Sequence, residues 1–460
     1  MLYSSTRGND NNLSFSDVLL NGLAKDGGLY VPKKFPLYTK KELNIFRKLD
    51  YPDLTYELTK NFISKEISDR TYKDICRKTY KEAFGKKIIS MDKLNDNEYI
   101  LNLFHGPTYA FKDFALQLLG NIYDYILRKK KIKLNVLGAT SGDTGSAAIY
   151  GCSKSSNIKI FILFPYGKVS EIQRRQMTTF SKPNVFNIAV RGDFDDCQKL
   201  VKDFFSLNNK REKINLAAIN SINWVRIMGQ IVYYFWSYFK VRKNLDPLSF
   251  VVPTGNFGNV YAGFISKKMG LPIEKLVVCS NKNDILTRFF NSGKMVVKNT
   301  MKSLSPSMDI QVSSNFERLL FDFYNSGSQI KKLFLDLEKK GSFEIRKEYL
   351  NEMKDFFEFG KLSDKETIKT IQTMAKKYNI IIDPHTAVGC SVGKKKLKDS
   401  ETRIYLATAH YGKFLDTVRK ATERNIDYPL GLKSLIKKKE KYTLIENSIC
   451  HLEKLINKNI

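Results

Sequence analysis

The chain has few of the residues that build metal sites and disulfide frameworks. Its 460 residues include only six cysteines and four histidines. The cysteines, at positions 76, 152, 197, 279, 390 and 450, form no Cys-x-x-Cys pair, so we expect reduced and mostly buried thiols. The histidines show no metal-ligand spacing, and the sequence therefore predicts no metal site.

Long apolar runs are missing as well. The longest, residues 231–239 and 160–164, are much shorter than the roughly 20 residues that a membrane-spanning helix needs. Residues 1–7 contain no charged region followed by an apolar core, so we expect no signal peptide. With 42% hydrophobic residues and a mean hydropathy of −0.33, the composition is that of a soluble enzyme. We expect a cytoplasmic protein with no membrane partner.

The net charge is strongly positive, at +30. A basic domain can bind nucleic acid, but no zinc-finger spacing, aromatic RNA-binding signature or recognition-helix pattern accompanies the lysines. Lysine and asparagine are abundant along the whole chain, which favours a general compositional bias. We therefore expect no nucleic-acid partner, and a charge that helps to draw an anionic substrate toward the site.

One lysine stands in an unusual setting. Residues 105–114 read HGPTYAFKDF, so that Lys112 follows a Gly-Pro turn, lies between two phenylalanines and precedes an apolar run with helical spacing. A helix start and apolar neighbours both disfavour an ammonium, so the pKa of the Lys112 amine should fall. A lysine with a lowered pKa can form a Schiff base. On this segment alone, a surface lysine between core aromatics would be the better interpretation.

Two glycine-rich loops follow short apolar runs, at residues 136–148 (VLGATSGDTGSAA) and 250–259 (FVVPTGNFGN). Each pattern predicts a buried strand, a tight loop and the first turn of a helix. Glycines let backbone N–H groups approach an anion, and the helix N-terminus adds positive potential. Neither loop has the ending of a nucleotide P-loop or the Gly-x-Gly-x-x-Gly dinucleotide fingerprint. Together with Lys112, the loops indicate a phosphorylated cofactor, a phosphorylated substrate or both.

Short apolar runs alternate with helical patterns through the middle of the chain. This alternation favours an α/β fold with doubly wound, mostly parallel sheets and a ligand at the carboxyl ends of the strands. Strands are expected at residues 134–137, 158–164, 185–190, 250–252, 276–279, 380–382 and 404–407.

The two ends of the chain differ from its middle. Residues 1–95 predict a mainly helical N-terminal unit. Residues 96–415 form the expected catalytic core, in which a polar stretch at about residues 292–363 is interpreted as an insertion or a mobile lid. Residues 416–460 predict a lysine-rich helical tail.

Further motifs occur at residues 3–8 (YSSTRG), 22–32 (GLAKDGGLYVP), 220–230 (NSINWVRIMGQ), 383–387 (DPHTA) and 407–410 (ATAH). In this order, and with the three segments above, they make the chain resemble the threonine synthases, pyridoxal-phosphate enzymes of the tryptophan-synthase-β type. The length and N-terminal extension are similar to the longer enterobacterial and fungal branch. The resemblance implies fold type II, in which two doubly wound α/β domains hold pyridoxal 5'-phosphate in the cleft between them.

The resemblance also implies a role for each residue of the cofactor site. Lys112 would bind the cofactor covalently and then act as the mobile base. Asp143 would lie near the 3-hydroxyl of the cofactor. Thr408 would hydrogen-bond the ring nitrogen, although a core threonine at a strand end is an equal interpretation of the sequence alone. The cofactor phosphate would be bound by the backbone of Gly255, Asn256, Phe257, Gly258 and Asn259.

The substrate that the resemblance implies is O-phospho-L-homoserine, whose phosphate needs a second site. Arginine suits bidentate phosphate binding, and Arg226 matches the family's position for it. The alternative for Arg226 is an ordinary surface ion pair on an aromatic-rich helix. The reaction would expel phosphate from Cγ and add water at Cβ to give L-threonine, and we expect a monomer or weak dimer. The other residues expected to bind the substrate are Thr140, Ser141, Thr144 and Asn220.

Two departures from the family pattern and two rival functions remain. The departures are Tyr109, beside the lysine, and Tyr411, after the ATAH motif. A serine/threonine dehydratase or a cysteine-synthase-like enzyme would share the fold and the lysine, but would not need Arg226 and Asn220 as a second anion site. The other rival is a catalytically inactive phosphate-binding or interaction protein.

Overall fold

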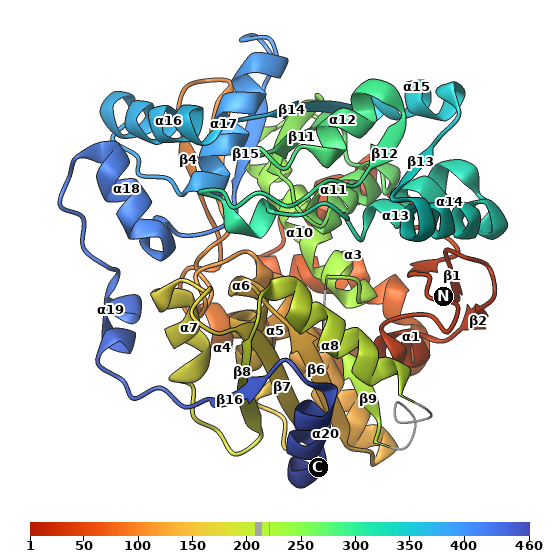
Figure 1. The fold of residues 1–460 in the computed structure, drawn as a ribbon. Coiled ribbons are helices and arrows are strands. Elements are labelled where there is room, and N and C mark those ends of the chain that lie inside the picture. The colour runs from red at the N-terminus through yellow and green to blue at the C-terminus, as the bar shows by residue number, and fades with distance from the viewer. Residues whose placement is uncertain (208–213, 220) are drawn as a thin grey trace.

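Two sheets of mostly parallel strands form the framework of the molecule, the larger in the upper half of Figure 1 and the smaller in the lower half. The structure, a computed structural model, describes residues 1–207, 214–219 and 221–460. Helices surround both sheets. The arrangement confirms the expected α/β fold with doubly wound, mostly parallel sheets.

The larger sheet has six strands in the order β14-β11-β10-β15-β5-β4, and only the β4–β5 pair is antiparallel. These strands are β4 (Ser90–Lys93), β5 (Glu98–Asn102), β10 (Leu248–Pro253), β11 (Ile273–Ser280), β14 (Phe357–Lys361) and β15 (Arg403–Ala407). The smaller sheet has five parallel strands in the order β16-β8-β7-β6-β9. They are β6 (Leu134–Ala139), β7 (Ile158–Pro165), β8 (Val185–Arg191), β9 (Leu216–Ala218) and β16 (Thr443–Glu446).

Helices cover both faces of each sheet, which is why the strands read as continuous apolar runs in the sequence. In the first half of the chain the helices are α1 (Phe15–Asn21), α2 (Lys40–Phe46), α3 (Tyr51–Ile63), η1 (Ser64–Glu66), α4 (Asp69–Phe84), α5 (Lys112–Lys130), α6 (Asp143–Cys152), α7 (Glu171–Thr178), α8 (Phe194–Ser206) and α10 (Trp224–Val241). In the second half they are α11 (Gly258–Lys268), α12 (Ile285–Ser292), η2 (Pro306–Met308), α13 (Phe316–Tyr324), α14 (Gly327–Lys340), α15 (Lys347–Phe356), α16 (Asp364–Lys377), α17 (Pro384–Lys396), η3 (Tyr411–Phe414), α18 (Leu415–Thr422), α19 (Leu430–Ile436) and α20 (Ile449–Asn459).

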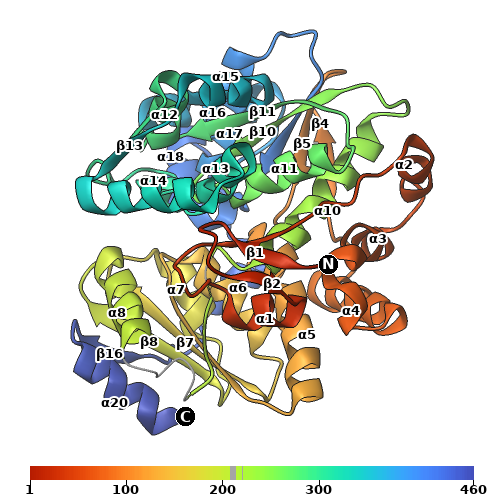
Figure 2. The same cartoon turned by 90° about the vertical axis from the view of Figure 1, so that its right-hand side faces the viewer.

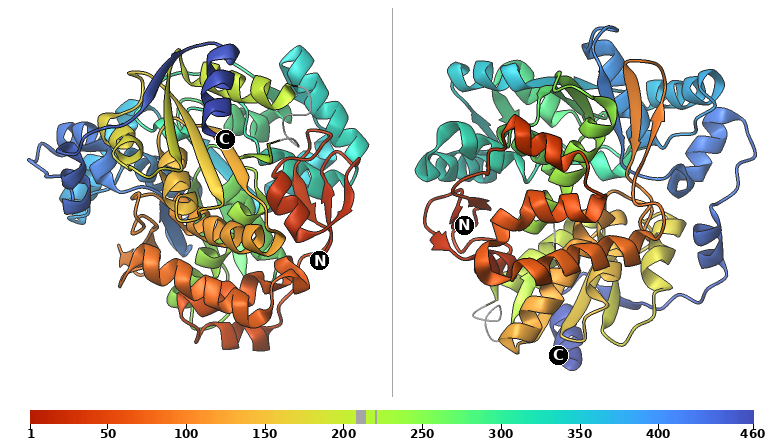
Figure 3. Two further views of the ribbon diagram at one scale, coloured as in Figure 1. Left: turned by 90° about the horizontal axis from the view of Figure 1, so that it is seen from below. Right: turned by 180° about the vertical axis from the view of Figure 1, so that it is seen from behind.

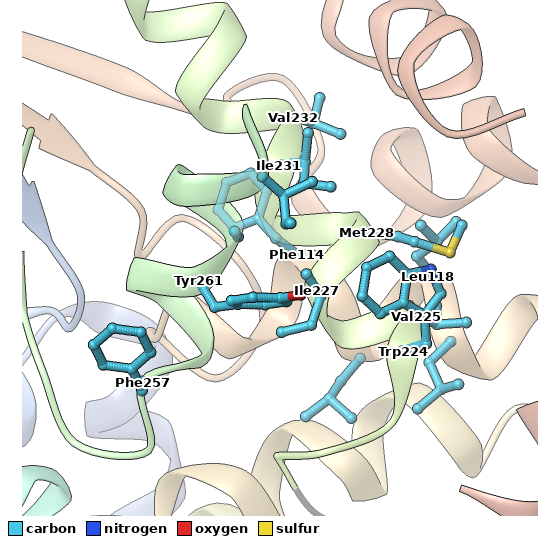
Figure 4. Close-up of a cluster of buried hydrophobic side chains, with 14 of the residues drawn as sticks. Phe114, Leu118, Trp224, Val225, Ile227, Met228, Ile231, Val232, Phe257 and Tyr261 are labelled. Carbon is cyan, nitrogen blue, oxygen red and sulfur yellow. The ribbon is translucent and has the colours of Figure 1, made fainter. Parts of the chain in front are cut away.

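The helix α10 lies at the centre of the molecule and is buried on nearly all sides. A helix that is apolar all round needs partners on every face. Its start is capped by Asn223, whose side chain accepts a hydrogen bond from the N–H of Val225 at 3.1 Å. Figure 4 shows α10 between α5 and the start of α11, with these side chains labelled: Trp224, Val225, Ile227, Met228, Ile231 and Val232 from α10, Phe114 and Leu118 from α5, and Phe257 and Tyr261 beside and on α11.

The helices α5 and α6 cross so closely that neither has room for a side chain at the crossing. A Cβ on Gly120 would lie 2.1 Å from the carbonyl oxygen of Gly151, and a Cβ on Gly151 would lie 2.3 Å from that of Leu116. The glycines therefore fix the position of α5, and with it Lys112, against the first helix of the smaller sheet.

A small antiparallel sheet near the N-terminus lies across the boundary of the two halves (Figure 2). Its strands, in the order β2-β1-β3, are β1 (Tyr3–Ser5), β2 (Asn11–Leu13) and β3 (Tyr30–Pro32), so the N-terminal unit is not only helical. Arg7 forms an ion pair with Glu317 at 3.0 Å, and the hydroxyl of Thr6 donates to the same carboxylate at 2.6 Å. The buried Arg318 donates to the carbonyl of Tyr30, which ties this sheet to α13.

The C-terminal tail runs along one side of the molecule from the upper to the lower half (Figures 1 and 3). It forms α18, α19 and α20, as expected, but it also contributes β16, which pairs in parallel with β8 as the edge of the smaller sheet. The sequence did not indicate this strand, because its four residues are mostly exposed and carry only one buried side chain, Ile445.

Two sequence-based expectations are wrong. Residues 380–382 are not a strand; they lead into α17, where Asp383 caps the helix by accepting a hydrogen bond from the N–H of Thr386 at 2.8 Å. The expected insertion at 292–363 ends too late, because β14 pairs with β11 as a strand of the larger sheet. The segment before β14 also holds a two-stranded antiparallel sheet, formed by β12 (Lys294–Val296) and β13 (Ser342–Glu344).

Five of the six cysteines are buried, as the sequence predicts, and Cys450 is exposed; all six are free thiols in the structure. Among the described residues, no helix has the length and apolar character to span a membrane. In the same residues, no three His, Cys, Asp or Glu side chains come together as a metal site.

Candidate active site

Lys112 is the first residue of α5, as the sequence predicts. The turn before it is shaped by Thr108, whose N–H and hydroxyl both donate to Oδ2 of Asp113, at 2.8 and 2.9 Å. The N–H of Phe111 donates to the carbonyl of Thr408 at 2.9 Å, just after β15 ends. Lys112 therefore lies where a helix start meets the carboxyl edge of the larger sheet.

The amine of Lys112 is surrounded by protein, and its side chain is only 14% exposed. Its pKa is lowered to about 8, mainly by burial; Asp143 opposes the shift, and Arg226 and Lys413 add to it. A useful fraction of the amine is thus neutral near pH 7, and only the neutral form can attack an aldehyde or take up a proton.

Asp143, the first residue of α6, forms ion pairs and hydrogen bonds with residues from several parts of the chain. Its Oδ1 lies 2.5 Å from Nζ of Lys413 and accepts a hydrogen bond from Nε2 of Gln173 at 2.8 Å. Its Oδ2 accepts from the hydroxyl of Ser307 at 3.1 Å and lies 4.0 Å from Nζ of Lys112. Burial acts to raise the pKa of this carboxyl, but the two lysines outweigh it and hold the pKa well below its usual range. Asp143 is therefore ionised.

The loop between β10 and α11 has the form of an anion cradle. No hydrogen bond between described residues uses the backbone N–H groups of residues 255–259, and α11 begins in this loop. Phe257 has a φ of 62°, a left-handed conformation that turns the loop, and its ring packs on Phe316 in the core. Phe257 can therefore contribute only its backbone to a ligand.

Two further features make this loop fit a phosphate. A Cβ on Gly255 would lie 2.6 Å from the carbonyl oxygen of Ser307, so the loop is closely covered and needs glycine there. Asn259 accepts hydrogen bonds from the hydroxyls of Tyr233 and Tyr234. Its Nδ2 is buried and has no partner among the described residues, as expected of a donor that serves a bound anion.

One cavity brings most of the predicted residues together. Those that line it are Lys112, Thr144, Arg226, Gly255, Asn256, Phe257, Gly258, Asn259 and Thr408. The residues that also line it but were not predicted include Ser221, Gln230, Thr254, Ser307 and His385. Three helix starts therefore meet at the cavity. The start of α5 supplies the amine of Lys112, the start of α11 supplies the anion cradle, and the first turn of α10 supplies Arg226.

Arg226, in the first turn of α10, is 4% exposed, so it is not the ordinary surface arginine that the sequence alone also allowed. Burial lowers the pKa of its guanidinium to about 10, which leaves it charged at neutral pH. A buried cation beside a cavity and a helix start forms a second site that favours an anion.

Two predicted substrate residues, Thr140 and Ser141, do not line the cavity. The hydroxyl oxygen of Thr140 accepts hydrogen bonds from the N–H groups of Gly142 and Gly145, at 3.0 and 2.9 Å, and so shapes its own loop. Ser141 is exposed and does not line the cavity. Asn220 lies outside the described residues.

Sequence reasoning missed His385, Ser307 and Lys413. His385 belongs to a quoted motif, and its Nε2 accepts a hydrogen bond from the N–H of Ser307 at 3.2 Å. Ser307 came from the stretch interpreted as an insertion, and nothing distinguished Lys413 in a chain so rich in lysine. The two departing tyrosines, Tyr109 and Tyr411, pack on the ring of His410 and do not line the cavity.

These features fit a phosphorylated aldehyde cofactor. Lys112 can bind the aldehyde, and the loop at residues 255–259 can bind the phosphate through free N–H groups and Asn259. Thr408 supplies a hydroxyl in the same cavity. The fold and site together define a pyridoxal-phosphate-dependent enzyme, and comparison with known proteins agrees: a model described as pyridoxal-phosphate dependent enzyme matches residues 88–333.

Two more specific models match segments on either side of this region. Residues 2–80 match a model of the threonine synthase N terminus, and residues 386–456 match a threonine synthase C-terminal model. The threonine synthase of Pseudomonas aeruginosa is 42% identical over 100% of this chain and 98% of its own, and that of Saccharomyces cerevisiae is 39% identical over 98% and 96%. The crystal structure of PLP-bound threonine synthase from Brucella melitensis is 40% identical and superposes with a TM-score of 0.95 over 99% of both chains.

The chain belongs to the threonine synthase family. It is a pyridoxal-phosphate-dependent lyase of threonine biosynthesis.

The lowered pKa of Lys112 predicts how the cofactor-free enzyme takes up pyridoxal phosphate. The rate of reconstitution should rise with pH and reach half its maximum near pH 8, because it depends on the neutral amine. At pH 7 about a tenth of the amine would be neutral, against about 0.03% for an unshifted lysine. Stopped-flow absorbance between pH 6 and 10 would measure this, with Lys112→Ala as the control that forms no borohydride-sensitive band. A midpoint above pH 10 would contradict the account.

Proposed function

We propose that the enzyme converts O-phospho-L-homoserine and water into L-threonine and inorganic phosphate. The observation that carries this proposal is that one cavity contains two separate anion-binding features, the loop at residues 255–259 and Arg226. The loop suits the phosphate of the cofactor. Arg226 lines the same cavity and suits a phosphate on the substrate, because its planar guanidinium can bind two phosphate oxygens at once.

Lys112 performs the proton transfers in this proposal. When bound, pyridoxal phosphate supplies the electron sink that stabilises negative charge at Cα. Lys112 would hold the cofactor through its amine; when free, that amine would take protons from Cα and Cβ in turn and return protons to Cγ and Cα. A pKa near 8 suits this work, because a base is most effective when its pKa lies near the working pH.

The phosphate leaves from Cγ, and the cations of the site assist its departure. Arg226 presents a planar set of donors to the phosphate oxygens and stabilises the charge that collects on them as the C–O bond breaks. Thr144 lines the same cavity and can donate from its hydroxyl. Thr140 and Ser141 would act through the loop that carries Thr144, and Asn220 is proposed from the family resemblance alone.

Two residues tune the cofactor. We assign Asp143 to the vicinity of the 3-hydroxyl, which its position 4.0 Å from Nζ of Lys112 supports. Thr408, which lines the cavity, is proposed as the partner of the ring nitrogen. A hydroxyl, unlike a carboxylate, leaves that nitrogen largely unprotonated and so moderates the electron sink.

The remaining expectations are also proposals. The unpaired and mostly buried cysteines support a reducing compartment such as the cytoplasm. We propose that the enzyme acts on its small-molecule substrate as a monomer or weak dimer, without a nucleic-acid partner.

The reaction is tested by comparing two substrates. With O-phospho-L-homoserine, phosphate and L-threonine should appear in equal amounts. Ammonia release from L-serine or L-threonine, the reaction of the dehydratase alternative, should be at least about 100-fold slower, because a site built for a charged group rejects an analogue that lacks it. Faster ammonia release than phosphate release would favour the dehydratase.

Replacing Arg226 tests the second anion site. Arg226→Ala should lower kcat/KM for O-phospho-L-homoserine by about 10- to 150-fold, the equivalent of a charge-assisted hydrogen-bond pair worth about 1.5–3 kcal/mol. Both KM and kcat should change, because binding and departure of the phosphate use the same charge. The matched control is Lys240→Ala, which removes an exposed cation from the last turn of the same helix. Kinetics unchanged from the wild type in Arg226→Ala would reject the assignment.

A further inference from the structure

The site contains a second buried lysine. Lys413 lies in η3, five residues after Thr408, and its side chain is 0% exposed. Its Nζ lies 2.5 Å from Oδ1 of Asp143 and donates a hydrogen bond to the carbonyl of Thr108 at 2.9 Å. A fully buried ammonium is costly unless such partners surround it, so this position is a specific one.

The two partners of Lys413 belong to the two segments that carry the chemistry. Asp143 begins α6, and Thr108 lies in the turn that leads to Lys112. The carbonyl of Thr108 also accepts from Nε2 of Gln176, at 2.9 Å. Lys413 thus connects the end of the larger sheet with a loop of the smaller sheet and with the lysine turn.

Two lysines lie near the Asp143 carboxylate, and the distances show that it forms the closer ion pair with Lys413. Nζ of Lys413 is at 2.5 Å, whereas Nζ of Lys112 is at 4.0 Å. Gln173 and Ser307 supply further donors to the same carboxylate, at 2.8 and 3.1 Å. Lys413, Gln173 and Ser307 therefore donate to the Asp143 carboxylate, which needs no close ion pair with Lys112.

The charged groups that face Lys112 come from three elements. They are Asp143 from α6, Arg226 from α10 and Lys413 from η3. His385, which lines the same cavity, accepts a hydrogen bond at Nε2. If Lys413 were absent, Asp143 would keep its negative charge close to Lys112 with no other lysine at hand, and would favour the protonated form of that amine.

We propose that Lys413 is a positioning residue that occupies the Asp143 carboxylate and thereby keeps the Lys112 amine free to react. The proposal rests on the proposed role of Lys112 as the residue that binds the cofactor. It assigns to Lys413 no contact with the substrate. Lys413 affects the reaction through its ion pair with Asp143, and it supports the turn before Lys112 through its hydrogen bond to the carbonyl of Thr108.

The test is the pH dependence of reconstitution with pyridoxal phosphate, measured on the cofactor-free full-length chain. Lys413→Met, which has a similar length but no charge, should move the midpoint upward by one pH unit or more relative to the wild type. Lys420→Met, which removes an exposed lysine from the neighbouring α18, should leave the midpoint unchanged. A lysine with a merely structural role would alter the amount of folded protein or the maximal rate, but not the midpoint.

A double variant identifies the group through which Lys413 acts. In Lys413→Met/Asp143→Asn the buried carboxylate loses its charge together with its partner, so the midpoint should return to the wild-type value or below. This variant also avoids an unpaired buried charge, so it can be studied even where Lys413→Met fails to fold. In that case it is compared with Asp143→Asn alone, and the two midpoints should differ by less than one pH unit, because Lys413 then has no carboxylate through which to act.

The outcomes separate this proposal from the proposed function. A wild-type midpoint near pH 8 with an equal midpoint in Lys413→Met would overturn the role of Lys413 and leave that of Lys112 intact. A double variant whose midpoint stays one pH unit or more above that of the wild type or of Asp143→Asn would also overturn it. Reconstitution that survives in Lys112→Ala would instead contradict the proposed role of Lys112 itself.

Discussion

The site depends on one buried carboxylate whose charge must be balanced. Asp143 is almost fully buried, and an isolated charge at such a position would be too costly to keep. Its partners come from both halves of the molecule: Gln173 from α7 beside the smaller sheet, and Ser307 and Lys413 from the half that holds the larger sheet. The ion pair and hydrogen bonds of Asp143 therefore also connect the two halves next to Lys112.

The central helix α10 gives this arrangement its rigidity. It packs between α5, which begins with Lys112, and α11, which begins in the loop at residues 255–259. Its own first turn carries Arg226. Three helix starts thus meet at one cavity, and two of them, those of α10 and α11, bring the positive end of a helix dipole to a place where an anion is expected. The aromatic and aliphatic side chains around α10 fix the relative positions of the amine and of the two anion-binding features.

The sequence was sufficient for the parts of the site that follow from local pattern. A Gly-Pro turn before an apolar run singled out Lys112, and strand–loop–helix spacing located the loop at residues 255–259, since each depends only on turn residues and apolar periodicity. It could not identify Lys413 or Ser307, because their roles come from burial and from partners far away in sequence, as in the 164-residue separation of Ser307 and Asp143. For the same reason β16 was missed, since its pairing with β8 is a long-range event. Residues 380–382 were mistaken for a strand because an apolar run before a helix cap has the same composition.

The assignment of Lys112 is tested most directly by locating the covalent bond to the cofactor. The holoenzyme would be reduced with borohydride, digested, and its phosphopyridoxyl-modified peptide sequenced by mass spectrometry. Two buried lysines, Lys112 and Lys413, lie beside Asp143, so the result discriminates between close neighbours. We expect the modification on Lys112 alone. Modification of Lys413, or of any other lysine in place of Lys112, would contradict this assignment.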